Sequence, residues 1–256
     1  MTINFDLISD LYLETLDNFS WENKATSLFC IVAGNISNDH DVLFDFLEEL
    51  SKYYEAVFFI DGDLEHDKFE GDFDRSYASL RDNIGDMETV FFLHENIIIL
   101  PGVTLLATNG WTTFDFTSQH TIDETLDFLE EHEGVPIEVS NQIFKLAITD
   151  QHYMYNSIES AQDMDDVEDI IVITNSVPNS EFVVHDNDYD GTLLGDTSGN
   201  GGILHCLEND YKKKVKTWIF GKYTGDIDYD IEGVRYVNNP GLQKDPSIYY
   251  PKIIKT

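Results

Sequence analysis

The feature that most constrains the fold is a series of short apolar runs, each followed at once by small, amide or acidic residues. Three of them open the chain: INFDLIS, SLFCIVAG and EAVFFID, at residues 3–9, 27–34 and 55–61. Runs of this length are typical of strands buried on both faces in a parallel sheet. Such sheets place their functional sites at the carboxyl ends of the strands. We therefore expect Asp10, Asn35 and Asp63 to lie at one edge of the sheet.

Residues 38–54, NDHDVLFDFLEELSKYY, carry apolar side chains at helical spacing, with Asn38 or Asp39 as the expected N-cap. The first 61 residues therefore read as a β-α-β-α-β unit. Further on, the pattern predicts strands in 89–95, 96–102, 103–111 and 168–179, helices in 121–132 and 138–162, a helix, a turn and a strand in 201–222, and a last strand in 233–241. We expect one α/β domain over residues 1–256, with a mixed second sheet.

The balance of charge limits the classes of partner. The chain has 49 acidic and 15 basic residues, a formal net charge of −34, and no Lys or Arg between Lys145 and Lys212. A surface of this charge repels nucleic acid phosphates and anionic membranes, so neither is an expected direct partner. Two interpretations stay open. The charge serves solubility or a high-salt habitat, or it serves docking to a protein with a basic surface.

Location is expected to be cytoplasmic. No apolar run approaches the roughly 20 residues of a membrane helix, and no basic stretch followed by an apolar one opens the chain. The two cysteines, Cys30 and Cys206, are far apart in sequence, and the apolar surroundings of Cys30 predict a buried thiol.

Five strand-end blocks occur in a fixed order: SDLYLE (9–14), AGNISND (33–39), DGDLEHD (61–67), ITNSVPN (173–179) and FGKYTGD (220–226). In this order they resemble the calcineurin-like metallophosphoesterase family, over nearly the whole chain. VTLLATNGWTTFDF (103–116) and EGVRYVNNPG (232–241) resemble its Trp-containing loop and its closing strand. The resemblance implies a two-sheet β-sandwich flanked by helices, in α/β/β/α layers.

Members of that family bind two divalent metals with His, Asp and Asn side chains in these blocks. The resemblance implies that only Asp10 is retained unchanged here. Tyr12 stands in the place of the first His, and Asn35 in the place of the bridging Asp. Asp63 replaces the Asn of the third block, and Leu64 replaces its His. A phenol with a pKa of about 10 is a poor metal ligand near pH 7.

The last two blocks depart from the family pattern in the same way. Asn175, with Ser176 after it, occupies the place of a later His, and Lys222 and Thr224 replace the two His of the final block. A lysine inside a metal site opposes a dication. Two alternatives follow: Lys222 pairs with Asp10 or Asp63, or a single Mg²⁺, Mn²⁺ or Ca²⁺ remains on those two carboxylates.

Four further features are expected to be structural. His40 and His66 read as surface residues on turns, and the His205–Cys206 pair matches no metal-site spacing. Asp186–Gly191 matches half of a calcium loop, but Thr197 stands where that loop needs Glu, so an acidic surface loop is favoured. The basic cluster Lys212–Lys216 is expected to cap a helix end, with docking of an acidic partner as the alternative.

The function expected from these residues is that of a catalytically inactive metallophosphoesterase-like protein, acting as a binding, regulatory or structural module for a protein partner. Neither a catalytic residue nor a cofactor is expected. Two alternatives stay open. One is an altered metal-dependent phosphoesterase. The other is an acidic mimic of nucleic acid that inhibits a nucleic-acid-binding protein.

Overall fold

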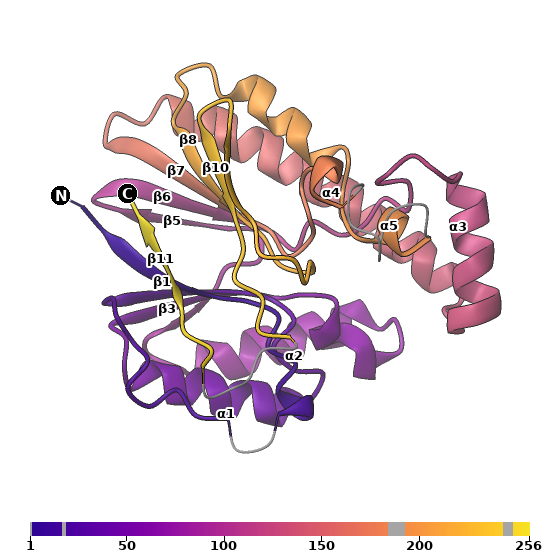
Figure 1. The fold of residues 1–256 in the computed structure, drawn as a ribbon, viewed down its shortest axis with the longest axis horizontal. Helices are drawn as coiled ribbons and strands as arrows, with labels where there is room; N and C mark the ends of the chain where they lie inside the picture. The colour runs from indigo at the N-terminus through magenta and orange to yellow at the C-terminus, as the bar shows by residue number, and fades with distance from the viewer. Residues whose placement is uncertain (1, 17–18, 184–192, 243–247) are drawn as a thin grey trace.

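The computed structural model describes residues 2–16, 19–183, 193–242 and 248–256. Two β-sheets pack face to face, and helices cover the outer face of each (Figure 1). The helices α1 (His40–Ser51) and α2 (Phe73–Gly85) lie against the first sheet, and α4 (Ile137–Gln162) lies against the second. The α/β/β/α sandwich expected from the sequence is confirmed.

The first sheet has the strand order β11-β1-β2-β3-β4. Its strands β1 to β4 are parallel, and β11 runs antiparallel to β1 at one edge. Every residue of β3 is buried, which accounts for its unbroken apolar run. The bounds of the strands are β1 Asn4–Ile8, β2 Phe29–Ala33, β3 Ala56–Ile60, β4 Val90–Phe92 and β11 Lys252–Lys255.

The second sheet is mixed, as expected, with the order β5-β6-β7-β8-β10-β9. Its four inner strands are parallel, and β5 and β9 pair antiparallel at the two edges. The bounds are β5 Asn96–Leu100, β6 Gly102–Ala107, β7 Val167–Ile173, β8 Val215–Ile219, β9 Asp228–Ile231 and β10 Val234–Val237.

Short helices join these elements. A capping box between Thr121 and Glu124 begins α3, and the Asp39 side chain caps α1, as predicted. The remaining helical segments are η1 Leu13–Thr15, η2 Leu64–Phe69, α3 Ile122–Phe128, the π-helical turn η3 Leu129–Glu133, η4 Ser180–Phe182, α5 Leu193–Thr197 and η5 Ile203–Asn209.

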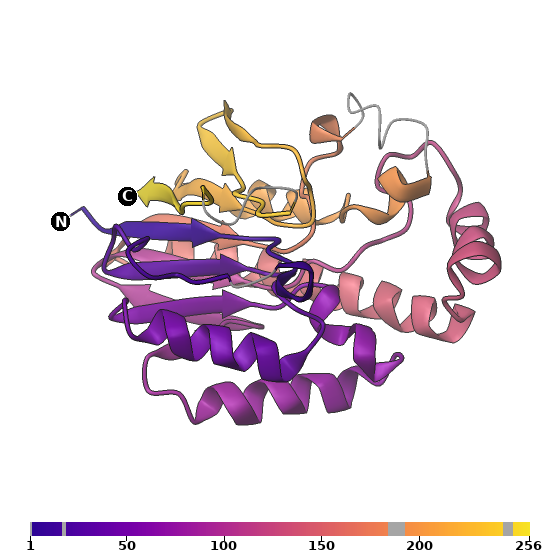
Figure 2. The same ribbon diagram turned by 60° about the horizontal axis from the view of Figure 1, so that its bottom comes forward.

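The long helix α4 contributes to the apolar clusters outside both sheets. Near its middle, Ala147 packs in the cluster that contains α1 and α2. Towards its end, Met154 and Ile158 pack in the cluster that covers the second sheet. Figure 2 shows α1 and α2 together on the first sheet, on the side away from the second. The first half of α4 therefore reaches across to the loops that follow β3.

Two predictions about the elements are wrong, and one helix was not predicted. The described residues between β1 and β2 form only the short helix η1, so the first 61 residues are not a β-α-β-α-β unit. The strand β10 is not the last, because β11 follows it and returns to pair with β1. The helix α2 was not expected, because Arg and Asp residues dominate its exposed face.

The basic cluster caps the end of α4, as predicted. Lys214 Nζ donates to the carbonyl oxygens of Ala161 at 3.4 Å and Met164 at 2.7 Å. Lys212 Nζ lies 3.1 Å from Asp163, the C-cap residue of the helix. Cations near a helix C-terminus meet the negative end of its dipole.

Three further expectations concern the Cys30 thiol, the match to a calcium loop and membrane-spanning helices. Cys30 is a buried free thiol, as predicted. The calcium-loop match at 186–191 lies outside the described residues. Across the described ranges, none of the helices has the length and apolar character that a membrane span requires.

Candidate functional site

The carboxyl ends of five strands from both sheets converge on one group of polar side chains. Asp10, Asn35 and Asp63 follow β1, β2 and β3, and Asn175 and Lys222 follow β7 and β8. We call these five residues the polar centre. The parallel strands bring them together even though up to 212 residues separate them in sequence.

A continuous set of contacts links the five residues. Asn35 Nδ2 donates to Asp10 Oδ1 and to Asn175 Oδ1, both at 3.0 Å. Asn175 Nδ2 donates to Asp63 Oδ1 at 3.4 Å. The backbone N–H of Lys222 donates to Asp10 Oδ1 at 2.7 Å, and its ammonium lies 2.5 Å from Asp63 Oδ2. The ion pair predicted for Lys222 is thus formed with Asp63.

The backbone of the polar centre is strained at three positions. Asp10, Asn35 and Lys222 have φ angles of 52°, 55° and 63°, in the left-handed region that non-glycine residues rarely adopt. Such a conformation costs on the order of 1 kcal/mol each and persists only where the surroundings enforce it. Here it turns each chain sharply at a strand end and directs backbone and side-chain polar groups inwards.

Three glycines let the loops approach Asn175 Oδ1 closely. A Cβ at Gly34, Gly62 or Gly221 would lie 2.6, 2.7 or 3.1 Å from this oxygen. At Gly62 it would also lie 2.5 Å from Asn35 N, well inside van der Waals contact. The amide of Asn175 therefore fills the space between the strand ends.

Burial dominates the electrostatics of Asp10. Its side chain is 2% exposed, and burial raises its pKa to about 7 against the opposing hydrogen bonds from Asn35 and Lys222. Its Oδ2 has no hydrogen-bond partner of good geometry among the described residues, although the Ser9 hydroxyl lies close enough to oppose the rise in pKa. Asp63, in contrast, keeps the Lys222 ammonium as its counter-charge.

The donor set of the polar centre does not fit a pair of divalent metals. Two carboxylates and two neutral amides face one another, and the Lys222 ammonium lies against one of the carboxylates. Among the described residues, no group of three or more His, Cys, Asp or Glu side chains is arranged to hold a metal ion. A dication would have to displace the ammonium from Asp63.

The remaining predicted site residues lie around the polar centre. Tyr12 is half-buried, and its backbone N–H donates to Asn35 O at 3.3 Å. Leu64 is buried, and its N–H donates to Asn35 Oδ1 at 3.1 Å. Thr224 is half-buried and makes none of the hydrogen bonds recorded for the polar centre among the described residues.

Glu65 holds two of the strand-end loops together, and the sequence reasoning did not identify it. Its fully buried carboxylate accepts from the backbone N–H groups of Gly62 at 2.6 Å, Ile36 at 2.6 Å, Asn35 at 3.1 Å and Ser37 at 3.2 Å. Burial raises its pKa to about 7, against these hydrogen bonds. The only signal in the sequence is a third acidic residue within the block DGDLEHD.

The histidine expectations are corrected. His66 is 4% exposed rather than solvated, because its Nε2 lies 2.9 Å from the buried Asp61 carboxylate. Burial tends to raise the pKa of Asp61, but the hydrogen bond from His66 and the electrostatic effect of His94 and His66, with a smaller contribution from Asn109, hold that pKa below its usual value. His40 lies on α1, half-buried, with its ring against Ser79 and the backbone of Glu65. Neither ring reaches the polar centre, and His205 is exposed, 3.1 Å from Glu208.

Comparison with known proteins gives a fold and no closer relationship. No protein-family model matches this sequence, and no curated protein matches it. The similar solved structures include the phosphopantetheinyl hydrolase of Mycobacterium tuberculosis, with a TM-score of 0.73 and 12% identity, over 98% of this chain and 95% of that one. At this identity the likeness shows that the fold is metallophosphoesterase-like.

Two further structures match more weakly. A protein described as a 5′-nucleotidase of Staphylococcus aureus has a TM-score of 0.44 and 13% identity, over 99% of this chain and 53% of that one. The anchor protein GAP50 of the inner membrane complex of Plasmodium has a TM-score of 0.47 and 11% identity, over 99% of this chain and 81% of that one.

Proposed function

We propose that this chain is a non-catalytic protein with a metallophosphoesterase-like fold, which serves as a binding module for a protein partner with a basic surface. The observation that carries the proposal is the ammonium group of Lys222, 2.5 Å from Asp63 where the strand ends meet. A cation built into the chain supplies the counter-charge of that carboxylate and opposes the approach of a dication.

The amides of Asn35 and Asn175 support the same conclusion. Asn35 donates to Asp10 and to Asn175, and Asn175 donates to Asp63, so the loops are joined by neutral groups of the chain itself. A neutral amide is a weaker ligand than a carboxylate or an imidazole. This arrangement preserves the shape of the strand ends without needing a metal.

The charge of the chain supports a basic partner. A formal net charge of −34 creates a negative field that attracts a positive surface and accelerates the encounter with it. A partner of this kind is expected to bind more weakly as salt is added, because mobile ions screen exposed charges within about 10 Å at 0.1 M.

The proposal is tested by an assay for phosphoester hydrolysis. The purified chain is incubated with p-nitrophenyl phosphate and bis(p-nitrophenyl) phosphate, each with Mg²⁺, Mn²⁺ or Ca²⁺. We expect no release of nitrophenolate above that of an Asp10→Ala variant purified in parallel. Hydrolysis by the natural chain that disappears in this variant would overturn the proposal.

A second candidate is an altered phosphoesterase that keeps one cation on Asp10 and Asp63. The observation that favours it is the buried Asp10 Oδ2, which lacks a hydrogen-bond partner among the described residues. Calorimetric titration with Mn²⁺ decides between the two candidates. Saturable binding of one ion, lost in Asp10→Asn, would favour the second candidate, and the absence of a binding heat would remove it.

A further inference from the structure

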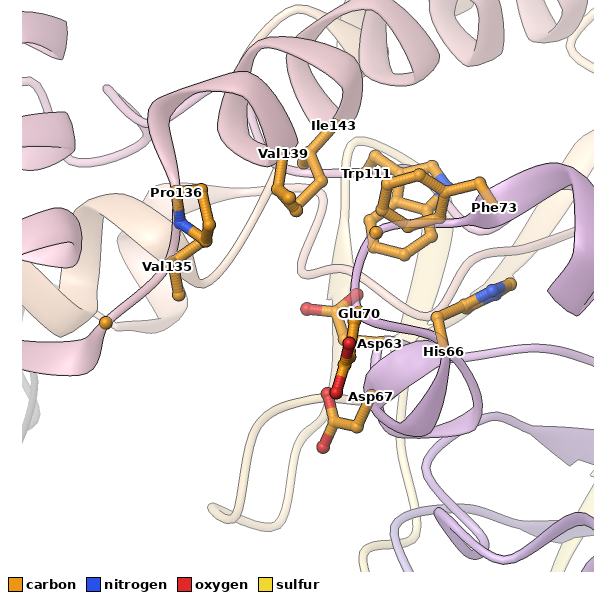
Figure 3. Close-up of a pocket in the computed structure, with 12 residues that line it drawn as sticks. Asp63, His66, Asp67, Glu70, Phe73, Trp111, Val135, Pro136, Val139 and Ile143 are labelled. Atoms are coloured by element: carbon orange, nitrogen blue, oxygen red, sulfur yellow. The ribbon is translucent and has the colours of Figure 1, made fainter.

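A pocket opens beside the polar centre and shares Asp63 with it (Figure 3). Its volume is about 600 Å³, and its walls come from η2 and the turn after it, from Trp111, and from the start of α4. Cavities of about 300–1,000 Å³ are the usual size for binding small organic groups. We call this cavity the acidic pocket.

One wall of the acidic pocket carries three carboxylates. Asp63 and Glu70 flank η2 at its two ends and Asp67 lies within it, so the three lie together (Figure 3). The described residues that line the pocket include neither Lys nor Arg. Lys222 is held by Asp63, and the nearby Lys68 lies 2.7 Å from Asp39 on α1's N-cap. No salt bridge is recorded among the described residues for Asp67 or Glu70.

The opposite wall is apolar. The rings of Phe73 and Trp111 meet edge to face at a centroid distance of 5.1 Å. Val139 and Ile143 project from α4 across the pocket from the carboxylates (Figure 3). The Trp111 Nε1 donates to Tyr77 in the interior, so the indole contributes mainly apolar surface to the pocket.

The acidic wall is short of positive charge. The Asp67 side chain is exposed at the mouth of the pocket, yet the surrounding protein and the neighbouring charge of Asp63 raise its pKa to about 6. The exposure makes the crowding of negative charge the better supported of the two causes. A cation from outside would relieve this crowding, whereas a phosphate or carboxylate would increase it.

We propose that the acidic pocket receives a Lys or Arg side chain of the protein partner, together with an apolar side chain next to it in the partner's sequence. The ammonium or guanidinium group meets Asp67 and Glu70, and the apolar neighbour packs on Val139 and Ile143. The aromatic wall also favours a cation, because the face of an indole or phenyl ring attracts positive charge. This inference rests on the proposed function and names the part of the partner that the surface recognises.

A protein side chain is the favoured source of the cation because the pocket joins an acidic wall to an apolar one. A polyamine carries closely spaced charges and lacks a branched apolar group, so it would leave the α4 wall uncovered. A hydrated metal ion would use the carboxylates alone. The test therefore compares these ligands directly.

The experiment is a titration of the ¹⁵N-labelled full chain with the blocked dipeptide acetyl-Leu-Arg-amide, followed by NMR. We expect saturable shifts of the Trp111 indole N–H signal and of the amides of Gly134 and Val135. Acetyl-Leu-Glu-amide and acetyl-Ser-Arg-amide are expected to bind at least about fivefold more weakly, since each lacks one of the two matching groups. Equal binding of acetyl-Leu-Glu-amide, or tighter binding of spermidine or Mg²⁺, would overturn the proposal.

Substitutions in the acidic pocket test whether the dipeptide binds there. The double variant Asp67→Asn/Glu70→Gln is expected to weaken the binding of acetyl-Leu-Arg-amide at least about tenfold, because it removes both carboxylates that would meet the guanidinium group. The double variant Glu48→Gln/Glu159→Gln is the matched control: it removes two exposed charges, on α1 and on the far half of α4, from residues that do not line the pocket. Equal losses in the control and in Asp67→Asn/Glu70→Gln would assign the binding to the overall charge and reject the pocket.

The two proposals fail separately. Hydrolysis that depends on Asp10 would reject the proposed function and leave the dipeptide shifts unchanged, because Asp10 does not line the pocket. Absence of dipeptide binding would reject the pocket and leave the hydrolysis assay unaffected.

Discussion

The polar centre and the acidic pocket are neighbours that share Asp63, but charge is balanced differently in the two. In the polar centre, the ammonium of Lys222 and the amides of Asn35 and Asn175 meet the carboxylates within hydrogen-bonding distance. In the acidic pocket, Asp67 and Glu70 face a space lined by apolar side chains. The centre contains a cation for Asp63 and leaves one oxygen of Asp10 without a partner among the described residues, whereas no Lys or Arg among the described residues lines the pocket.

The largest effect is expected from disturbing the close approach of the loops in the polar centre. In Gly62→Ala, the added Cβ meets Asn35 N and Asn175 Oδ1 at 2.5 and 2.7 Å. We expect the free energy of unfolding to fall by about 3 kcal/mol, the upper range for overpacking. Denaturation by urea measures this.

Gly85→Ala is the matched control, because a Cβ at Gly85 meets nothing within 4 Å. It is expected to leave the stability unchanged or to raise it by up to about 1 kcal/mol. If the two variants unfolded at the same urea concentration, the polar centre would not be closed as described.

The next effect concerns the lysine. Lys222→Met leaves Asp63 facing Asp10 without a cation, so we expect a loss of about 2 kcal/mol. Lys68→Met breaks an ion pair of similar length, but both partners are about half exposed, at 52% and 41%, and a loss under about 0.5 kcal/mol is expected. Equal losses of unfolding free energy in Lys222→Met and Lys68→Met would show that the ion pair of Lys222 with Asp63 contributes no more than an exposed pair.

The variant Lys222→Met also tests whether the ammonium group of Lys222 keeps metal ions away from Asp10 and Asp63. Addition of Mn²⁺ is expected to raise the melting temperature of Lys222→Met and to leave that of the natural chain unchanged, because the two carboxylates then lack a counter-ion. Differential scanning fluorimetry checks this, with Lys68→Met as the control. Stabilisation of the natural chain by Mn²⁺ would contradict the prediction.

The third effect is a dependence of the stability on pH. It arises at Asp150, which holds the backbone of Trp111, a residue that lines the pocket. The buried Asp150 accepts hydrogen bonds from the backbone of Gly110 and Trp111, and burial raises its pKa from 3.8 to about 7. Between these values the folded chain keeps a proton that the unfolded chain has released. The stability that this group contributes is therefore present at low pH and is lost as the pH rises towards 7.

Asp150→Asn removes this titration. Its free energy of unfolding should be lower near pH 5, by about 1–3 kcal/mol for the lost acceptor. It should also fall less steeply with rising pH, by up to about 1.4 kcal/mol per pH unit. Urea denaturation at pH 5, 6 and 7 gives both quantities. Parallel curves for the two proteins would rule out a raised pKa at Asp150.

The smallest expected effect is the difference in stability between Asp67→Asn and Asp63→Asn. Asp67→Asn removes a carboxylate that no recorded salt bridge involves, so the stability is expected to stay the same or rise by about 0.5 kcal/mol. Asp63→Asn breaks the contact with Lys222 and is expected to cost about 1 kcal/mol. Thermal unfolding of the two variants, measured together, tests the contrast. A loss in Asp67→Asn equal to that in Asp63→Asn would erase the difference between the pocket and the centre.

The strands of the first sheet could be predicted because the signal is local. Short apolar runs mark β1, β2 and β3, interrupted in β1 by Asp6, and the residues that follow them meet at the sheet edge. In contrast, β11 has only four residues, and its place beside β1 depends on a pairing across almost the entire chain. A strand of this kind has too weak a pattern to be identified alone.

The polar contacts around the site were less predictable. An ion pair of Lys222 was one of two alternatives drawn from the sequence, with Asp10 or Asp63 as partner, and the contact with Asp63 is the one that forms. The burial of His66 could not, since it depends on Asp61 and on the rings of Phe73 and Trp111, which come from different elements. The carboxylate of Glu65 was missed for the same reason: its four donors are backbone groups, which carry no residue-specific signal.

The pairing of β11 with β1 has a consequence for synthesis of the chain. Ile254 stands opposite Phe5 and is fully buried between the sheets. A nascent chain on the ribosome therefore cannot complete its first sheet until Lys252–Lys255 has left the exit tunnel. Until then one edge of β1 stays open, and it is in this interval that the new protein most needs protection by chaperones.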